Sequence, residues 1–93
     1  MPLKEPLGFE WDDAKAGSNL AKHGVSFESA TAVFLDPARI DFDATLPGQG
    51  ESRRKVVGKI EGLIFTAVYT QRGEVIRLIS ARRANGKECK AYG

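Results

Sequence analysis

The chain has 93 residues, of which 42% are hydrophobic and 28% charged, a composition that excludes a disordered protein and predicts one soluble domain over residues 1–93. A single cysteine excludes an internal disulfide, and one cysteine with one histidine argues against a zinc site, so we expect no metal and no cofactor. No apolar run has the length of a membrane span or a signal-peptide core, which predicts a cytoplasmic protein without a membrane partner. Residues 1–8 are expected to be flexible.

The net charge of +2 is unevenly distributed along the chain. Residues 1–50 carry four basic and eight acidic side chains, a balance of −4, whereas residues 51–93 carry ten basic and four acidic ones, a balance of +6. A basic half is expected in a protein that binds a polyanion such as a nucleic acid. Ordinary solvated faces of strands and helices would give the same balance, so charge alone leaves both interpretations open.

Two helices are predicted in the first part of the chain. Asp12 or Asp13 can cap the first helix, and Gly24 is expected to end it in the left-handed conformation. The second helix begins after Ser26 and ends at Asp36, because the residue before a proline is disfavoured in a helix. About two residues separate the helices, which favours a helical hairpin. The side chains expected to pack on a sheet are Leu20, Phe27, Val33 and Phe34.

The rest of the chain predicts strands and one short helix. The segment "ARIDFD" alternates apolar and polar residues, as an edge strand does. Three further strands, "RKVVGKI", "LIFTAVYT" and "VIRLISA", are separated by tight turns, and residues 83–92 favour a short helix. We therefore predict an α+β fold, in which an N-terminal two-helix hairpin packs on a four-stranded antiparallel sheet with a short C-terminal helix. The second face of the sheet would be open to solvent or to a partner.

The double arginine after the last strand is the first candidate site. Arg82 and Arg83 are adjacent, so they point to opposite faces of the strand and could flank a groove. Guanidinium groups bind phosphate through two parallel hydrogen bonds. A solvated surface pair is the simpler alternative. Arg77, in the middle of the same strand, either joins this clamp or pairs with an acid such as Glu51 or Glu88.

Other charged side chains could contribute to the same chemistry. Glu51 is a candidate base or a partner for an arginine, and Arg53 and Arg54 after it lie on opposite faces of a strand. A charged hairpin would explain this run equally well. His23 is the only imidazole and is either a helix-capping group or a proton carrier. Lys87, in the terminal helix, is a further candidate for RNA binding.

Several segments together resemble the BrnT family of bacterial type II toxins. The stretch "FEWDDAKAGSNLAKHGVSFESA" is similar to the opening of that family, and "GESRRKVVGKIEG", "FTAVYTQRGEVIRLISARRA" and "KECKAY" resemble later parts of it. The resemblance covers Phe9–Tyr92. Each motif has low specificity by itself, and it is their order and spacing that make the match specific.

The resemblance implies a RelE-like ribonuclease fold and a metal-independent endoribonuclease that inhibits translation and arrests growth. It implies neutralisation by a small BrnA-like antitoxin, in a dimer or a heterotetramer. The toxin–antitoxin complex of the family represses its own operon, with operator DNA contacted mainly through the antitoxin. Family activity is expected at the positions of Arg82, Arg83, Glu51 and Arg53.

A metal-free mechanism gives these residues roles as hypotheses. Arginines do not release protons near neutral pH, so Arg82, Arg83 and Arg77 are expected to stabilise the charge that develops on the phosphate. The base that takes the 2′-hydroxyl proton stays open between Glu51, His23 and no dedicated group.

The alternative function is a non-catalytic nucleic-acid-binding module, or a degenerate toxin that only binds its antitoxin. Two departures from the family pattern motivate it, because Gly86 and Cys89 stand where the terminal helix of the family is more strongly helical and more basic.

Overall fold

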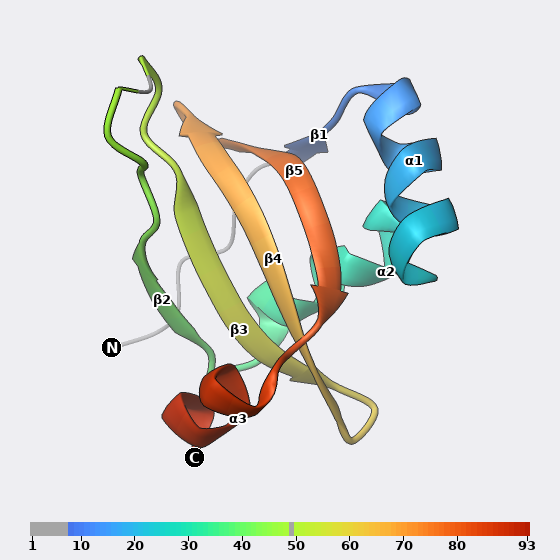
Figure 1. Ribbon diagram of the computed structural model, residues 1–93, viewed down its shortest axis with the longest axis vertical. Helices are drawn as coiled ribbons and strands as arrows, with labels where there is room; N and C mark the ends of the chain where they lie inside the picture. The colour runs from blue at the N-terminus through green and yellow to red at the C-terminus, as the bar shows by residue number, and fades with distance from the viewer. Residues whose placement is uncertain (1–7, 49) are drawn as a thin grey trace.

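The structure is a computed structural model that describes residues 8–48 and 50–93 (Figure 1). Its elements are β1 (Gly8–Glu10), α1 (Asp13–His23), α2 (Phe27–Ala30), the 3-10 helix η1 (Thr31–Leu35), β2 (Ile40–Asp43), β3 (Arg54–Ile60), β4 (Leu63–Arg72), β5 (Val75–Arg83) and α3 (Gly86–Tyr92). The five strands form one sheet in the order β1-β5-β4-β3-β2, in which β1 runs parallel to β5 and every other pair is antiparallel. None of the described helices is long and apolar enough to cross a membrane.

The prediction of a two-helix hairpin on a four-stranded antiparallel sheet is wrong. Residues Gly8–Glu10 form a fifth strand before α1, and their parallel pairing with β5 makes the sheet mixed. Phe9 anchors this strand by packing on Phe34, with ring centroids 5.3 Å apart. An extended entry to the first helix is visible in the sequence, but its pairing with a strand 67 residues away is not, because three residues are too few to show an alternating pattern. Of the first eight residues, 1–7 lie outside the described residues.

The predicted helix ends are confirmed. The side chain of Asp12 accepts a hydrogen bond from the amide of Lys15 at 3.0 Å, and Gly24 ends α1 with a φ of 70°. Ser26 caps the following helix. That segment is an α-helical turn followed by the 3-10 helix η1, and it ends at Asp36 as expected.

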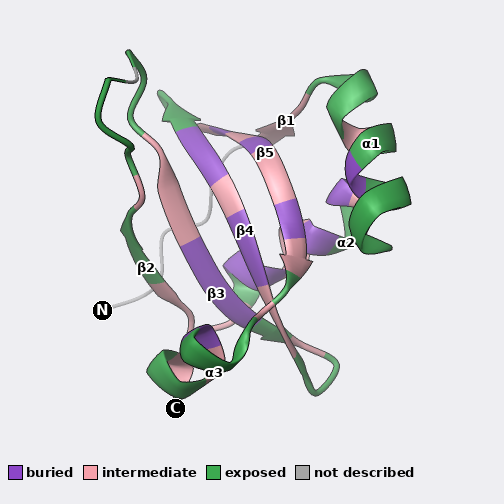
Figure 2. Cartoon of the chain, viewed as in Figure 1, coloured by how far each residue is buried: buried purple, intermediate pink, exposed green. Residues whose placement is uncertain are grey.

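The helical layer covers one face of the sheet, here called the helical face (Figure 2). Phe27, Val33 and Phe34 are buried there as predicted, but Leu20 is 51% exposed, so its predicted place in the core is wrong. Strand β4 lies at the centre of the sheet, in agreement with its apolar sequence. The buried core comprises Val25, Phe27, Ala30, Val33, Phe34, Val56, Ala67, Tyr69, Ile76, Leu78 and Ala81.

A buried asparagine ties α1 to the sheet. Asn19 donates through Nδ2 to the carbonyls of Ala81 (2.7 Å) and Val25 (3.0 Å), and its Oδ1 accepts from the amide of Ala81 (3.0 Å). It therefore acts on β5 much as a neighbouring strand would, by satisfying one residue's amide and carbonyl together. This contact fixes β5 from the helical face at the residue next to Arg82.

The opposite face of the sheet, here called the open face, is covered at one end by α3 (Figure 1). Val56 and Val57 are both fully buried although adjacent strand residues point to opposite faces. Val56 belongs to the core under the helical layer, whereas Val57 faces the side on which α3 packs against β3. The remainder of the open face carries most of the candidate site residues.

Strand β3 and helix η1 approach each other closely at Gly58. A Cβ atom there would lie 2.9 Å from the carbonyl oxygen of Val33 and 3.1 Å from its Cβ. We expect Gly58→Ala to lower the free energy of unfolding by about 1–3 kcal/mol, because η1 must move away from the sheet. Urea unfolding measures the change. Gly17→Ala is the matched control: it meets no atom within 4 Å in helix α1 and should raise stability by up to about 1 kcal/mol. Equal effects of the two variants would contradict the close approach.

Candidate functional site: a basic cleft on the open face

A cleft of about 600 Å³ on the open face collects basic side chains from β3 and β5. We call it the arginine cleft. Phe42 and Lys55 face each other across β2 and β3, with the Lys55 ammonium 5.6 Å from the ring centroid. The residues that line it are Phe42, Asp43, Ala44, Thr45, Leu46, Arg53, Lys55, Val68, Ile79, Ser80 and Arg82.

Glu88 is the centre of the hydrogen-bond network beside this cleft. Arg82 binds it with two parallel hydrogen bonds, Nη1 to Oε1 at 2.7 Å and Nη2 to Oε2 at 2.8 Å. Lys55 Nζ donates to Oε2 at 3.2 Å, and Thr66 Oγ1 donates to Oε1 at 2.9 Å. These three partners come from three neighbouring strands, so one carboxylate on α3 links β3, β4 and β5 on the open face.

The network determines the protonation of its members. Hydrogen bonding from Arg82 is the largest cause that lowers the pKa of Glu88, opposed by burial and supported by the amide of Asn85, Thr66 and Lys55. The carboxylate therefore stays ionised at neutral pH, and the same bonds raise the pKa of Arg82. Arg82 is thus a fixed cation with its guanidinium plane set by Glu88.

Sequence reasoning named Glu88 only as a possible partner of Arg77 and missed this role. The local signal was present, because Asn85 and Glu88 have the spacing of a capping box. The structure shows both halves: the Asn85 side chain accepts from the amide of Glu88 at 2.8 Å, and Glu88 accepts from the amide of Asn85 at 3.0 Å. Gly86 follows the cap as the first residue of α3, where it does not interrupt the helix.

Arg83 lies on the other side of the sheet from Arg82, as adjacent strand residues must. Its guanidinium carbon is 5.6 Å from the centroid of the Phe65 ring, on the helical face. The structure therefore does not bring the two arginines into one cleft. Arg82 is 31% exposed at its side chain and lines the arginine cleft, whereas Arg83 does not.

A second hollow of about 410 Å³ lies next to the arginine cleft, and we call it the loop pocket. Arg77 does not pair with Glu51 or Glu88 but with Glu10 of β1, at 2.6 Å, so both predicted partners are wrong. Glu51 instead pairs with Arg72 at 3.3 Å. The residues that line the pocket are Lys15, Gly50, Glu51, Arg53, Arg72, Arg77 and Ile79.

The remaining candidates are dispersed. Arg54 pairs with Asp41 at 2.6 Å, beside Tyr69, whose pKa is raised mainly by burial. His23 is exposed at the end of α1 and lines neither basic hollow, and Lys87 is exposed on α3. Of the predicted site residues, the structure therefore brings Arg82 and Arg53 to the arginine cleft and leaves His23 in the helical layer.

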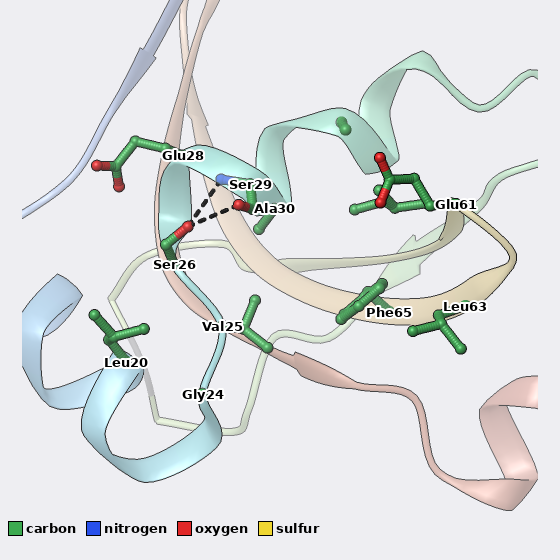
Figure 3. A pocket seen from close by; sticks show the side chains of 12 residues that line it. Leu20, Gly24, Val25, Ser26, Glu28, Ser29, Ala30, Glu61, Leu63 and Phe65 are labelled. Atoms are coloured by element: carbon green, nitrogen blue, oxygen red, sulfur yellow. Dashed lines mark hydrogen bonds between the residues drawn. The ribbon is translucent and has the colours of Figure 1, made fainter.

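A third hollow, of about 590 Å³, lies between the helical layer and the turn that joins β3 to β4 (Figure 3). Leu20, Val25, Leu63 and Phe65 give it an apolar lining, and the Ser26 hydroxyl bonds within the helix turn beneath it. Its charged lining residues are all acidic, namely Glu28 and Glu61. A phosphate would be repelled there, so the two basic hollows on the open face are the better sites for a polyanion.

The described part of the chain holds no group of three or more histidine, cysteine, aspartate or glutamate side chains placed to bind a metal ion. What the open face offers is guanidinium and ammonium groups with one ionised carboxylate that orients them. Such groups bind phosphate oxygens and stabilise negative charge on them.

A pre-oriented arginine in a basic cleft is an arrangement suited to binding phosphate groups. The comparison with protein families agrees: the family described as the ribonuclease toxin BrnT of type II toxin–antitoxin systems matches residues 11–88. The chain therefore belongs to the BrnT family of ribonuclease toxins, and a toxin of this type has an antitoxin partner. No curated protein matches the sequence.

Proposed function

We propose that the protein is a metal-independent endoribonuclease toxin that cleaves RNA in the arginine cleft and thereby inhibits translation and growth. The observation that carries this proposal is the Arg82 guanidinium, held by Glu88 next to Lys55 on the open face. Family membership supports RNA as the substrate and a ribonuclease as the enzyme class. A cognate BrnA-like antitoxin would neutralise the toxin in a dimer or a heterotetramer, and operator DNA would be contacted through that antitoxin.

The cleft suits the charge changes of RNA cleavage. The 2′-oxygen attacks the neighbouring phosphorus and a new P–O bond forms, while solvent water takes the proton of the 2′-hydroxyl. The bond to the 5′-oxygen breaks, and the departing oxygen takes a proton from water. Negative charge rises on the non-bridging oxygens in the transition state, and Arg82 and Lys55 are placed to stabilise it. With Arg53, three cations face two carboxylates, Glu88 and the lining residue Asp43, so the site keeps one excess positive charge.

The proton of the 2′-hydroxyl has no strong acceptor in the cleft. Asp43 is the one carboxylate among the lining residues, and hydrogen bonds from the amide and hydroxyl of Thr45 lower its pKa, which makes it a weak base. His23 and Glu51 do not line the cleft. We therefore propose that electrostatic stabilisation supplies most of the rate and that no dedicated base is required.

Purified toxin, freed of antitoxin, tests this function on naked RNA with and without EDTA. We expect cleavage that persists in EDTA and leaves 2′,3′-cyclic phosphate ends. Cleavage that stops in EDTA and returns with Mg²⁺ would contradict metal independence. RNA binding without cleavage would instead support the non-catalytic alternative.

A further inference from the structure

We propose that the loop pocket is a second phosphate site, which binds the RNA chain several nucleotides away from the phosphate that is cleaved. This inference rests on the proposed ribonuclease function. It assigns a role to Lys15 and Arg72, two cations that sequence reasoning did not select, and a new role to the end of the open face opposite α3.

The charges of the loop pocket favour an anion. Four cations contribute to its lining, from α1, from the residue before β3, from the end of β4 and from β5. Two carboxylates oppose them, Glu51 through Arg72 and Glu10 through Arg77. Four cations against two carboxylates leave two positive charges, which attract the single negative charge of a phosphodiester. The cations are Lys15, Arg53, Arg72 and Arg77.

Arg53 has unused hydrogen-bonding capacity. Its Nε is buried and has no hydrogen-bond partner among residues 8–48 and 50–93. Its backbone, by contrast, is fixed by Thr45, whose hydroxyl accepts from the amide of Arg53 at 2.9 Å. An arginine whose backbone is fixed while a buried donor stays unpaired is suited to donate to a ligand oxygen, because unsatisfied buried donors are costly.

The Arg72–Glu51 ion pair of the loop pocket contributes little to the stability of the fold. The Arg72–Glu51 pair is 3.3 Å long, and both side chains are about half exposed, at 53% and 50%. Exposed pairs of this kind contribute about 0–1 kcal/mol. Arg72 can therefore be shared with a phosphate oxygen at little cost to the fold.

The loop pocket and the arginine cleft form a continuous path. Both are lined by Arg53 and Ile79, so these two residues belong to their common wall. Arg77 and Arg82 are on the same strand and five residues apart, a separation of about 15 Å along β5. Both reach the open face because a register shift opposite Val68 and Tyr69 changes the alternation of side chains between them. A stacked single strand spans that distance with roughly four to five nucleotides. A substrate of two nucleotides would therefore reach only the arginine cleft.

The test compares Lys15→Gln and Arg72→Gln with the matched control Lys22→Gln, which removes an exposed cation from the same helix α1 outside the pocket. The binding probe is fluorescein-labelled mixed-sequence RNA with 2′-O-methyl groups, which cannot be cleaved by the 2′-oxygen. Fluorescence anisotropy gives Kd over a range of salt concentrations, and kcat/KM is measured on a dinucleotide and on a long RNA.

We expect each pocket variant to raise Kd about fivefold and to reduce the slope of log Kd against log salt by about 0.7. kcat/KM should fall for the long RNA and stay unchanged for the dinucleotide. If the pocket variants behave like Lys22→Gln while the wild type binds and cleaves RNA, the second site is wrong and the proposed function stands. If the wild type neither binds nor cleaves RNA, both the proposed function and the second phosphate site are wrong.

Discussion

Replacement of Arg82 by alanine should lower kcat/KM for RNA cleavage by about a hundredfold to a thousandfold, the cost of removing one pre-oriented group that stabilises developing charge. Arg82 is the cation whose geometry the structure fixes most firmly, through two hydrogen bonds to Glu88. Arg82→Lys keeps the charge and loses the paired hydrogen bonds, so we expect an intermediate loss. Initial rates on naked RNA measure both effects, and thermal unfolding of each variant checks that it folds.

Arg83→Ala provides the comparison that identifies the reactive face. Its guanidinium packs over Phe65 on the helical face, so we expect a loss of less than about tenfold. If Arg83→Ala abolishes cleavage and Arg82→Ala does not, the cleft has been placed on the wrong side of the sheet. If both abolish it, RNA must contact both faces at the end of β5.

Replacement of Glu88 by alanine should lower the free energy of unfolding by about 3–5 kcal/mol, because it leaves Arg82 and Lys55 without their shared partner. Glu88 is only 6% exposed and also completes the cap of α3. Urea unfolding monitored by circular dichroism gives the change. Glu28→Ala is the control, an exposed acid in the first turn of α2, and should cost less than about 1 kcal/mol. Similar losses in the two variants would show that the network around Glu88 contributes little.

The same carboxylate predicts how stability depends on pH. The pKa of Glu88 is lowered in the folded protein relative to its ordinary value of 4.5, so the native state binds fewer protons than the unfolded state. Its contribution is therefore present above about pH 4.5 and is lost as the pH falls below that value. Glu88→Gln cannot titrate, so its stability should depend less on pH in this range than that of the wild type. Parallel curves for the two proteins would contradict this assignment.

Local rules predicted the features of this fold that depend on neighbouring residues. Asp12, Ser26 and Gly24 mark helix ends by chemistry that acts within one turn, and the structure confirms each of them. The pairing of strand β1 with the sheet escaped prediction because its partner is 67 residues away and its three residues show no alternating pattern. Leu20 was misplaced because helical spacing shows which residues share a face and does not show how far that face reaches over the sheet.

For the candidate site too, local features were predicted from the sequence and long-range contacts were not. The sequence pointed to Arg82 and Arg53, and alternation along a strand correctly put Arg82 and Arg83 on opposite faces. It did not reveal that Glu88 is the acid that orients Arg82, because that contact requires α3 to fold back over the sheet. The partner of a charged side chain depends on which strands are neighbours in the fold. Arg77 pairs with Glu10 because the unpredicted strand β1 lies beside β5.

The position of Glu88 on α3 also means that it is synthesised after the cations that it orients. Lys55 precedes Glu88 by 33 residues and Arg82 precedes it by six, so the cations of the cleft are synthesised before the acid that fixes them. A domain generally folds as a unit during synthesis. While Glu88 is still inside the ribosome, Arg82 lacks the carboxylate that orients it. The arginine cleft of a nascent toxin therefore stays incomplete until α3 has emerged.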